Sequence, residues 1–202
     1  MYWIFIFAII PVIVLIPFGR ILVKRLILSA KIRKFCVENN LNFVGTHLLW
    51  CLGGKNGKNC DFYIESRDTV YSVKLWAMKR RHTILCFTYN GRYFIRGFVA
   101  FASGMSMGKI PVDSKFKTLP DFDFRYKFRE EWYVKDYKPI LLINPTCYEV
   151  RLIGRDKKES VVGRGQTVNG FYIHTLSSLL SKLYIEKSSN DFVDFIDSGN
   201  QL

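Results

Sequence analysis

The stretch 61-DFYIESRDTVYSVK-74 decides the fold of this 202-residue chain. Apolar residues recur at every second position on both sides of Arg67-Asp68, which predicts a β-hairpin with a two-residue turn. That turn pairs Ser66 with Thr69 and sets Asp61 opposite Lys74. An acid and a lysine therefore meet near one end of the hairpin. The same register pairs Tyr63 with Ser72 on that face and turns Phe62, Ile64, Tyr71 and Val73 toward the core.

Helix and turn signals lie on either side of this hairpin. Residues 26–40 lack glycine and proline and end in two asparagines, which predicts a helix. Asn90-Gly91 separates two apolar runs and predicts a second hairpin with a type I′ turn, because that turn needs positive φ at both central residues. Four glycine and proline stops within 104–120 indicate a long exposed connection.

The second half of the chain predicts further strands and a closing helix. Aromatic and charged residues alternate over 122–129, which is typical of a strand with one solvated face. The apolar run 140–143 indicates a strand covered on both faces. Residues 171–174 predict another strand, and Thr175 is placed to cap a helix over 176–185, where leucines recur at helical spacing.

The hairpin resembles the PD-(D/E)xK core of the restriction-endonuclease-like nucleases. That core has an aspartate on one strand and x-x-(D/E)-x-K on the next, and the order of predicted elements over 30–185 is similar to that of the family. The resemblance implies an α+β domain that consists of one mixed sheet with flanking helices.

The resemblance also implies roles for individual residues. In the family two acids hold Mg²⁺ on the scissile phosphate, and the lysine positions or activates the attacking water. Asp61 matches the first acid and Lys74 the lysine, whereas Ser72 stands where the second acid belongs. Glu38, at the end of the predicted helix, is the candidate replacement, because Glu65 lies about 13 Å from Asp61 along the strand. Mg²⁺ is the implied cofactor only if this site is active.

Three interpretations of Asp61 and Lys74 follow. The pair is a structural cross-strand ion pair worth roughly 0.2–1 kcal/mol, a degenerate nuclease-like site, or the centre of a Mg²⁺-dependent nuclease. The missing second acid favours a domain that binds or scaffolds without cleaving. The alternatives are a membrane-tethered nuclease and a structural partner of another membrane protein.

An uncharged run, Tyr2 to Phe18, precedes six bases that lie between Arg20 and Lys34. At about 1.5 Å per residue the run covers roughly 26 Å, close to the hydrocarbon thickness of a bilayer. Because the bases follow the run, we expect an uncleaved transmembrane helix with the rest of the chain in the cytoplasm. A signal peptide and a buried helix are the alternatives.

This interpretation divides the chain into four regions. They are a transmembrane anchor at 1–19, a basic juxtamembrane helix at 20–40, a cytoplasmic α+β domain at 41–187 and an acidic tail at 188–202 that we expect to fray. The predicted protein is therefore a single-pass membrane protein with a cytoplasmic C-terminal domain.

The formal net charge of +13 indicates anionic partners. One stripe of the juxtamembrane helix suits anionic lipid headgroups, and its members are Arg20, Lys24, Lys31 and Lys34. Two other basic sets are interleaved with aromatic residues, a pattern that favours weak binding of nucleic acid or another anion. These sets are Lys79, Arg80 and Arg81, and Arg125, Lys127 and Arg129.

The five cysteines show no repeated spacing and no C-x2-C pair. A disulfide framework and a zinc site both require such patterns, so we expect the cysteines to be small buried apolar residues and predict no metal site of Cys/His type. They are Cys36, Cys51, Cys60, Cys86 and Cys147.

Overall fold

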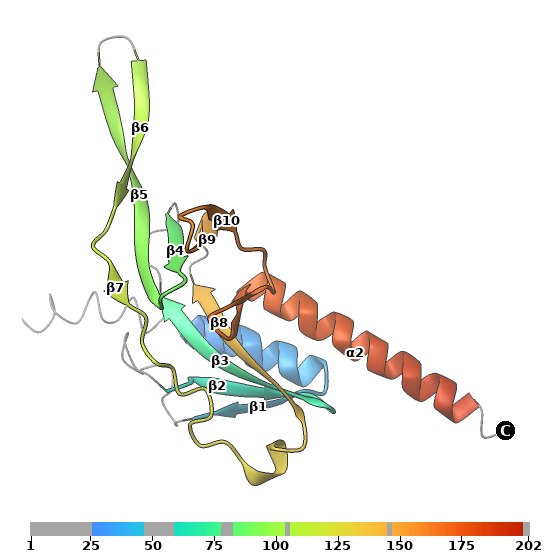
Figure 1. Cartoon of the computed structure of the whole chain (residues 1–202). Coiled ribbons are helices and arrows are strands. Elements are labelled where there is room, and N and C mark those ends of the chain that lie inside the picture. The colour runs from blue at the N-terminus through green and yellow to red at the C-terminus, as the bar shows by residue number, and fades with distance from the viewer. Residues whose placement is uncertain (1–25, 47–58, 78–82, 104–105, 145–146, 200–202) are drawn as a thin grey trace, which may run out of the picture.

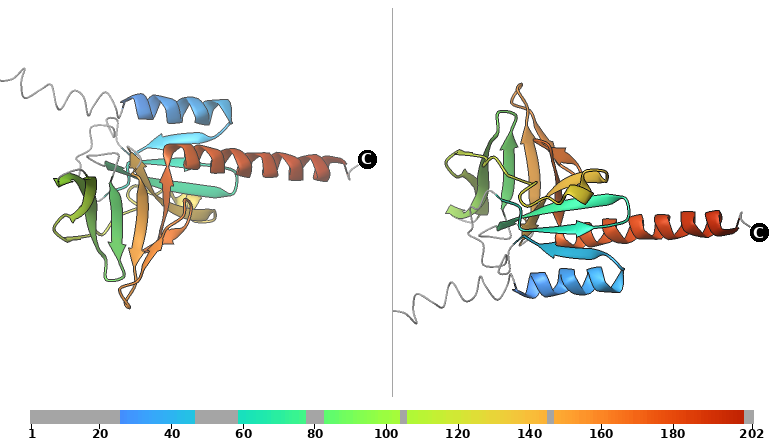
Figure 2. Two further views of the ribbon diagram at one scale, coloured as in Figure 1. Left: turned by 90° about the horizontal axis from the view of Figure 1, so that it is seen from above. Right: turned by 90° about the horizontal axis from the view of Figure 1, so that it is seen from below.

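The computed structural model describes residues 26–46, 59–77, 83–103, 106–144 and 147–199. Two β-sheets and a pair of helices form three layers (Figures 1 and 2). Sheet 1 consists, in spatial order, of β1 (Asn42–Gly45), β2 (Phe62–Glu65), β3 (Thr69–Ala77), β8 (Asp136–Asn144), β12 (Phe171–Thr175) and β11 (Thr167–Val168).

Sheet 2 and the helices complete the layers. Sheet 2 consists of β10 (Glu159–Val161), β9 (Glu149–Ile153), β4 (Ile84–Thr88), β5 (Arg92–Ser103) and β6 (Ser106–Asp113), with β7 (Lys117–Thr118) paired to β5. In the described residues the helices are the N-terminal helix at 26–38, the long α2 (Leu176–Gly199) and η2 (Glu130–Trp132), a 3-10 helix of one turn.

Both long helices cover the same face of sheet 1 (Figure 2). The N-terminal helix buries Leu28, Ile32 and Cys36, which are four residues apart and so lie on one stripe. From the other helix, α2, Leu179 and Leu183 reach the same core. The helices predicted over 26–40 and 176–185 are thus confirmed. Sheet 1 contributes Phe62, Ile64, Tyr71, Val73, Leu75, Ile140 and Leu142 to this core.

The N-terminal helix ends in a Schellman motif. Asn40 adopts a left-handed conformation with φ of 54°. The N–H of Leu41 donates to the carbonyl of Cys36 at 2.8 Å, and the N–H of Asn40 donates to that of Val37 at 3.3 Å. These bonds satisfy carbonyls that the helix end would otherwise leave free, and the motif turns the chain back into β1.

The β2–β3 hairpin has the predicted register. Tyr63 pairs with Ser72 and Phe62 pairs with Val73. The N–H of Asp61 donates to the carbonyl of Val73 at 2.9 Å, so the ladder extends to the acid. The apolar face predicted for this hairpin packs against the helices.

The central strand of sheet 1 is β8, which pairs in parallel with both β3 and β12. Its apolar run is buried on both faces, as predicted. Ile140 and Leu142 face the helices, whereas Leu141 and Ile143 face sheet 2. Strand β12, also predicted, leads directly into α2.

The second predicted hairpin is formed by β4 and β5, but its turn differs from the prediction. Gly91 has a φ of 71°, whereas Asn90 is not among the residues with positive φ, so the turn is not type I′. Positive φ at two successive positions occurs instead at Asn169 (49°) and Gly170 (84°), between β11 and β12. That Asn-Gly pair has the backbone signature of a type I′ turn.

The predicted fold class is wrong, because the part of the chain that the structure describes is mostly β and has two mixed sheets with two long helices. Periodicity identifies a strand but not the sheet that it joins. The inner faces of the two sheets bury each other, with Leu85 and Phe87 of β4 in the same core as Leu141 of β8. The prediction of one mixed sheet missed this second partner for the central strand.

Two segments also differ from the predicted secondary structure. The segment 122–129 is irregular, forms an isolated bridge from Asp123 to Asn59, and leads into η2. Its aromatic side chains still pack inward, which explains the alternation. The segment 104–120 contains β6 and β7, and β6 forms a two-stranded arm with β5 (Figure 1).

Within the described ranges, no helix is long and apolar enough to cross a membrane. The N-terminal helix and α2 each bury one stripe on sheet 1, and α2 continues to Gly199 into the predicted acidic tail. The predicted anchor at 1–19 lies outside the described residues. The prediction of a single-pass membrane protein with a cytoplasmic C-terminal domain is therefore corrected, because the helices that the structure describes are sheet-packing helices.

The turn between β11 and β12 gives a test of the fold. A Cβ at Gly170 would meet no atom within 4 Å, so Gly170→Ala changes only the backbone preference. We expect a loss of about 1–2 kcal/mol in the free energy of unfolding, measured by urea denaturation, because φ is positive there. Gly97→Ala is the control, since its Cβ would also fit but its φ is ordinary for a strand. Equal stability of the two variants would contradict the turn assignment.

Candidate functional site

The predicted pair of Asp61 and Lys74 is present and buried. Lys74 Nζ lies 3.3 Å from Asp61 Oδ2, and the two side chains are only 5% and 9% exposed, respectively. The ammonium also donates to the Asn59 carbonyl at 2.7 Å, while the carboxylate accepts the N–H of Leu75 at 2.7 Å. The hairpin register predicted this pair correctly. The energy predicted for it, roughly 0.2–1 kcal/mol, is that of an exposed cross-strand pair, whereas the pair is buried.

The face that carries this pair is covered by the segment before β8. The Tyr63 hydroxyl lies 2.7 Å from the carbonyl of Tyr126 and 3.2 Å from that of Phe124. Ser72 donates its hydroxyl to the same Phe124 carbonyl. Trp132 of η2 is fully buried and packs its ring 4.7 Å from the ring of Tyr63. The position where a second acid would belong is therefore closed by the chain itself.

Neither acid considered as a replacement reaches Asp61. Glu38 is exposed at the end of the N-terminal helix and pairs with Lys34 at 3.7 Å. That helix covers the opposite face of sheet 1. Glu65 accepts hydrogen bonds from Lys135 at 2.8 Å and Asn42 at 2.9 Å. Burial acts to raise the pKa of Glu65, but these hydrogen bonds outweigh it and hold that pKa below its usual range.

No cluster of three or more metal-ligating side chains occurs in the part of the chain that the structure describes. The four described cysteines are buried, as predicted, and burial raises the pKa of each thiol, that of Cys86 to about 11. They are Cys36, Cys60, Cys86 and Cys147, while Cys51 lies outside the described residues.

The basic set near η2 contacts its own domain. The Arg125 guanidinium lies 4.9 Å from the ring centre of Tyr137, and Lys127 Nζ donates to the Thr46 carbonyl at 3.2 Å. Arg129 pairs with Glu131 at 3.1 Å. These contacts serve the packing of the covering segment. The other predicted set, Lys79, Arg80 and Arg81, lies outside the described residues.

The stripe predicted to meet lipid headgroups is described only in part. Lys31 and Lys34 are exposed on the N-terminal helix, while Arg20 and Lys24 lie outside the described residues. Lys34 forms its ion pair with Glu38, one helical turn away.

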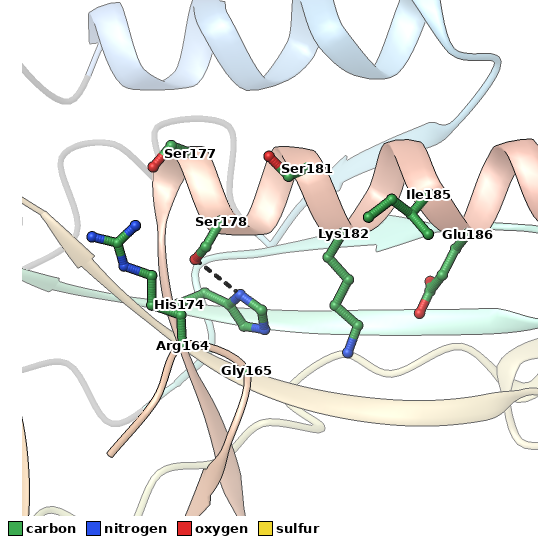
Figure 3. A pocket seen from close by; sticks show the side chains of 9 residues that line it. All are labelled: Arg164, Gly165, His174, Ser177, Ser178, Ser181, Lys182, Ile185 and Glu186. Carbon is green, nitrogen blue, oxygen red and sulfur yellow. Dashed lines mark hydrogen bonds between the residues drawn. The ribbon is translucent and has the colours of Figure 1, made fainter. Parts of the chain in front are cut away.

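A different site lies on the helical face of sheet 1, where β12 passes into α2. An open cavity of about 670 Å³ is lined by the loop before β11 and by the first turns of α2 (Figure 3). Arg164, His174 and Lys182 surround it, and Ser177, Ser178 and Ser181 add three hydroxyl groups. None of these residues belongs to a motif from which the sequence alone predicts a site.

Local hydrogen bonds hold the walls of this cavity together. The N–H of Gly165 donates to the carbonyl of Ile173 at 2.8 Å, and the N–H of Ile173 donates to that of Gln166 at 3.1 Å. These bonds bring the Arg164 loop against β12. The left-handed φ of Gly165, 83°, lets the loop pass close to the His174 ring, which would lie 3.5 Å from a Cβ at Gly165. Thr175 caps α2 through its contact with Ser178.

His174 is the most unusual group in the cavity wall. His174 is only 2% exposed, and its Nδ1 lies 3.1 Å from the Ser178 hydroxyl. Its other nitrogen, Nε2, is buried without a hydrogen-bond partner. Burial lowers the pKa of His174 to about 4, and the nearby Lys182 charge adds to that effect. The imidazole is therefore neutral near pH 7.

The charges around the cavity are unevenly distributed along α2. Burial lowers the pKa of Lys182, and the positive charge of Lys138 lowers it further. Farther along α2, Glu186 also lines the cavity and lies 3.3 Å from Lys138, while burial raises the pKa of its carboxyl. Arg164 thus lies at the start of α2, Lys182 lies about 9 Å along the helix axis, and Glu186 follows Lys182 by one helical turn, about 6 Å.

The sequence contained a signal for this site. An Asn-Gly turn, a short strand, a capping threonine and a helix follow one another over 169–178. Such strand-to-helix junctions expose backbone N–H groups at the helix start. The glycines on either side of Arg164 lack the six-position spacing of a nucleotide-binding loop.

Comparisons with protein-family models, with curated proteins and with solved structures found no match for this chain.

The buried ion pair can be tested by removing one partner. Lys74→Met should lower the free energy of unfolding by about 3–5 kcal/mol, because it removes the Lys74 ammonium from the buried Asp61 carboxylate. Lys34→Met is the matched control, since its ion pair with Glu38 is exposed, and we expect a change of about 0.5 kcal/mol or less. Urea denaturation measures both. A similar small effect for the two variants would show that the Asp61 pair is not buried.

The lowered pKa of His174 predicts a pH effect on stability. Between its ordinary pKa of 6.5 and about 4, the unfolded chain binds a proton that the folded protein excludes. The free energy of unfolding should therefore fall as the pH drops through this window, by about 3 kcal/mol at most from this group. His174→Gln should reduce the fall, while the carboxylates titrate alike in both proteins. Identical pH profiles for variant and wild type would contradict the assignment.

Proposed function

We propose that this protein is a non-catalytic binding domain. In this proposal, the nuclease-like pair Asp61 and Lys74 has a structural role, and the ligand binds in the cavity at the start of α2. The single observation that supports the structural role of the pair is the environment of the Asp61 carboxylate. This carboxylate accepts a backbone N–H and faces the Lys74 ammonium in the interior.

The geometry around Asp61 is unsuited to metal-dependent hydrolysis. Mg²⁺ requires oxygen ligands in an octahedral arrangement and usually retains several waters. The neighbours of the Asp61 carboxylate include an ammonium and an N–H, which are donors and not metal ligands. Ser72 stands in place of a second acid and lies under the Phe124 carbonyl. A substrate phosphate would have to displace the covering segment before it reached the pair.

The cavity at α2 supports the second half of the proposal. Ligand sites are concave and usually contain a few convergent polar groups, often with perturbed pKa values. This cavity has two cations, three serine hydroxyls and a buried imidazole with an unused nitrogen. It lies on the opposite face of sheet 1 from the Asp61 pair, so the two regions are physically separate.

A cleavage assay tests the non-catalytic role. Full-length protein with Mg²⁺ or Mn²⁺ should leave DNA and RNA intact, and Asp61→Asn should give the same result. Cleavage by the wild type that requires both the metal and Asp61 would overturn the proposal. A commercial nuclease under the same conditions verifies that the substrates are cleavable.

Restoring the missing acid gives a second, independent test. Ser72→Glu should destabilise the protein by at least about 2 kcal/mol, because it buries a carboxylate under a backbone carbonyl. Ser160→Glu is the matched control, since Ser160 is also a strand residue but is exposed. Metal-dependent stabilisation of the Ser72 variant, and not of the control, would indicate a preserved metal site instead.

A further inference from the structure

We propose that the cavity at the start of α2 binds the phosphoryl group of a small phosphate monoester, through Arg164, Lys182 and His174 Nε2. This inference rests on the proposed function, which places the ligand in this cavity. It adds the chemical class of the ligand and the atoms that recognise it.

The first argument is electrostatic. Arg164 and Lys182 both line the cavity, and in the described part of the chain neither takes part in an ion pair with a carboxylate. The start of α2 adds the positive end of a helix of 24 residues. Two cations and a helix start together match a dianion better than a single negative charge. A phosphate monoester has such a charge at neutral pH.

The second argument is independent of charge and comes from His174. A buried polar atom without a partner costs free energy, so an unused nitrogen in a cavity wall indicates a partner that is bound only in the liganded state. Nε2 is such an atom, and it belongs to a ring that stands between the Arg164 loop and Lys182 (Figure 3). The ring thus stands between the two cations, and binding requires the exposed Arg164 side chain, which points away from the ring in Figure 3, to turn toward it.

Ser178 determines which ring nitrogen of His174 carries the proton. Its hydroxyl accepts the N–H of Thr175 at 2.9 Å, and its proton can go either to the Thr175 carbonyl at 3.1 Å or to His174 Nδ1 at 3.1 Å. When the hydroxyl donates to Nδ1, the ring proton is on Nε2, which then donates to the ligand. A bound oxyanion selects this tautomer, because it accepts hydrogen bonds and has none to donate.

Access to Nε2 requires a side-chain movement. The atom exposes less than 1 Å² in the free protein. Lys182 is the mobile candidate, because its ammonium rests over the Tyr172 ring at 4.8 Å, a contact that a phosphoryl group would replace with a stronger one. Rotation of the lysine toward the ligand supplies a charge-assisted hydrogen bond.

The size and polarity of the cavity indicate that the ligand is more than a free anion. A volume of about 670 Å³ falls in the range of small-molecule sites and leaves room beyond a phosphoryl group. Ile185 and Glu186 line the far end, where an apolar carbon chain and a hydroxyl donor would fit. The carboxylates of Glu186 and Asp136 near that end disfavour an extended polyanion such as nucleic acid.

Calorimetric titration of the full-length protein tests this inference with three probes. They are glycerol 3-phosphate, inorganic phosphate and glycerol. We expect glycerol 3-phosphate to bind more tightly than inorganic phosphate, and glycerol not to bind at all. Equal affinities for glycerol 3-phosphate and inorganic phosphate would overturn the monoester assignment, and the absence of binding by both would overturn the phosphate site.

Variants locate the binding to the cavity. Arg164→Gln and Lys182→Met should each weaken glycerol 3-phosphate binding about tenfold or more, as expected for loss of a charge-assisted hydrogen bond. Lys158→Met is the control, because Lys158 is exposed and lies outside the cavity. In NMR spectra, the ring resonance of His174, assigned with His174→Gln, should shift on binding. Unchanged affinity in the two cavity variants would overturn the site.

A failure of the phosphate-binding inference can be distinguished from a failure of the proposed function. Metal-dependent cleavage that requires Asp61, together with phosphate binding in the cavity, would overturn only the non-catalytic role. Intact nucleic acids without phosphate binding would overturn only the ligand class.

Discussion

The parallel pairing of β3 with β8 holds the two candidate sites in place. Its register runs from Thr69 opposite Asp136 to Ala77 opposite Asn144. This pairing makes β8 an interior strand, so that its side chains need partners on both faces. The helices cover one face and sheet 2 covers the other. On the first face β12 leads into α2 and its cavity, and on the second face the pair of Asp61 and Lys74 is enclosed.

The enclosure of Asp61 and Lys74 shows how burial changes the meaning of a residue pattern. An acid and a lysine on an open hairpin can bind a metal and a phosphate. Under the aromatic segment that includes Trp132, the same two groups neutralise each other and satisfy the backbone at Asn59 and Leu75. A buried pair of this kind is weak evidence for net stability, but the loss of one partner is costly. The covering segment and the pair therefore depend on each other.

The cavity at α2 differs from the pair of Asp61 and Lys74 in the partners of its polar and charged groups. At the hairpin, each charged group has a partner within the protein. In the cavity, a buried imidazole nitrogen has none, and two cations line the same open space. Tyr71 Oη of the hairpin and Trp132 Nε1 of its cover are also buried without a partner, but neither lines this cavity. A folded protein gains little from such an arrangement unless something binds there, because unsatisfied groups and like charges both cost free energy. This contrast is the physical reason for placing the ligand at α2.

The sequence by itself determined the local elements and one register. Turn chemistry and apolar spacing were sufficient for the N-terminal helix, the two hairpins, the doubly buried run of β8 and the leucine stripe of α2, because each depends on neighbouring residues. The tertiary structure alone decided which sheet each strand joins, that 122–129 is a cover and not a strand, and that Asp61 is buried. It also brought the loop of Arg164 to the same cavity as His174 and Lys182, since no local pattern records which loop, strand and helix come together.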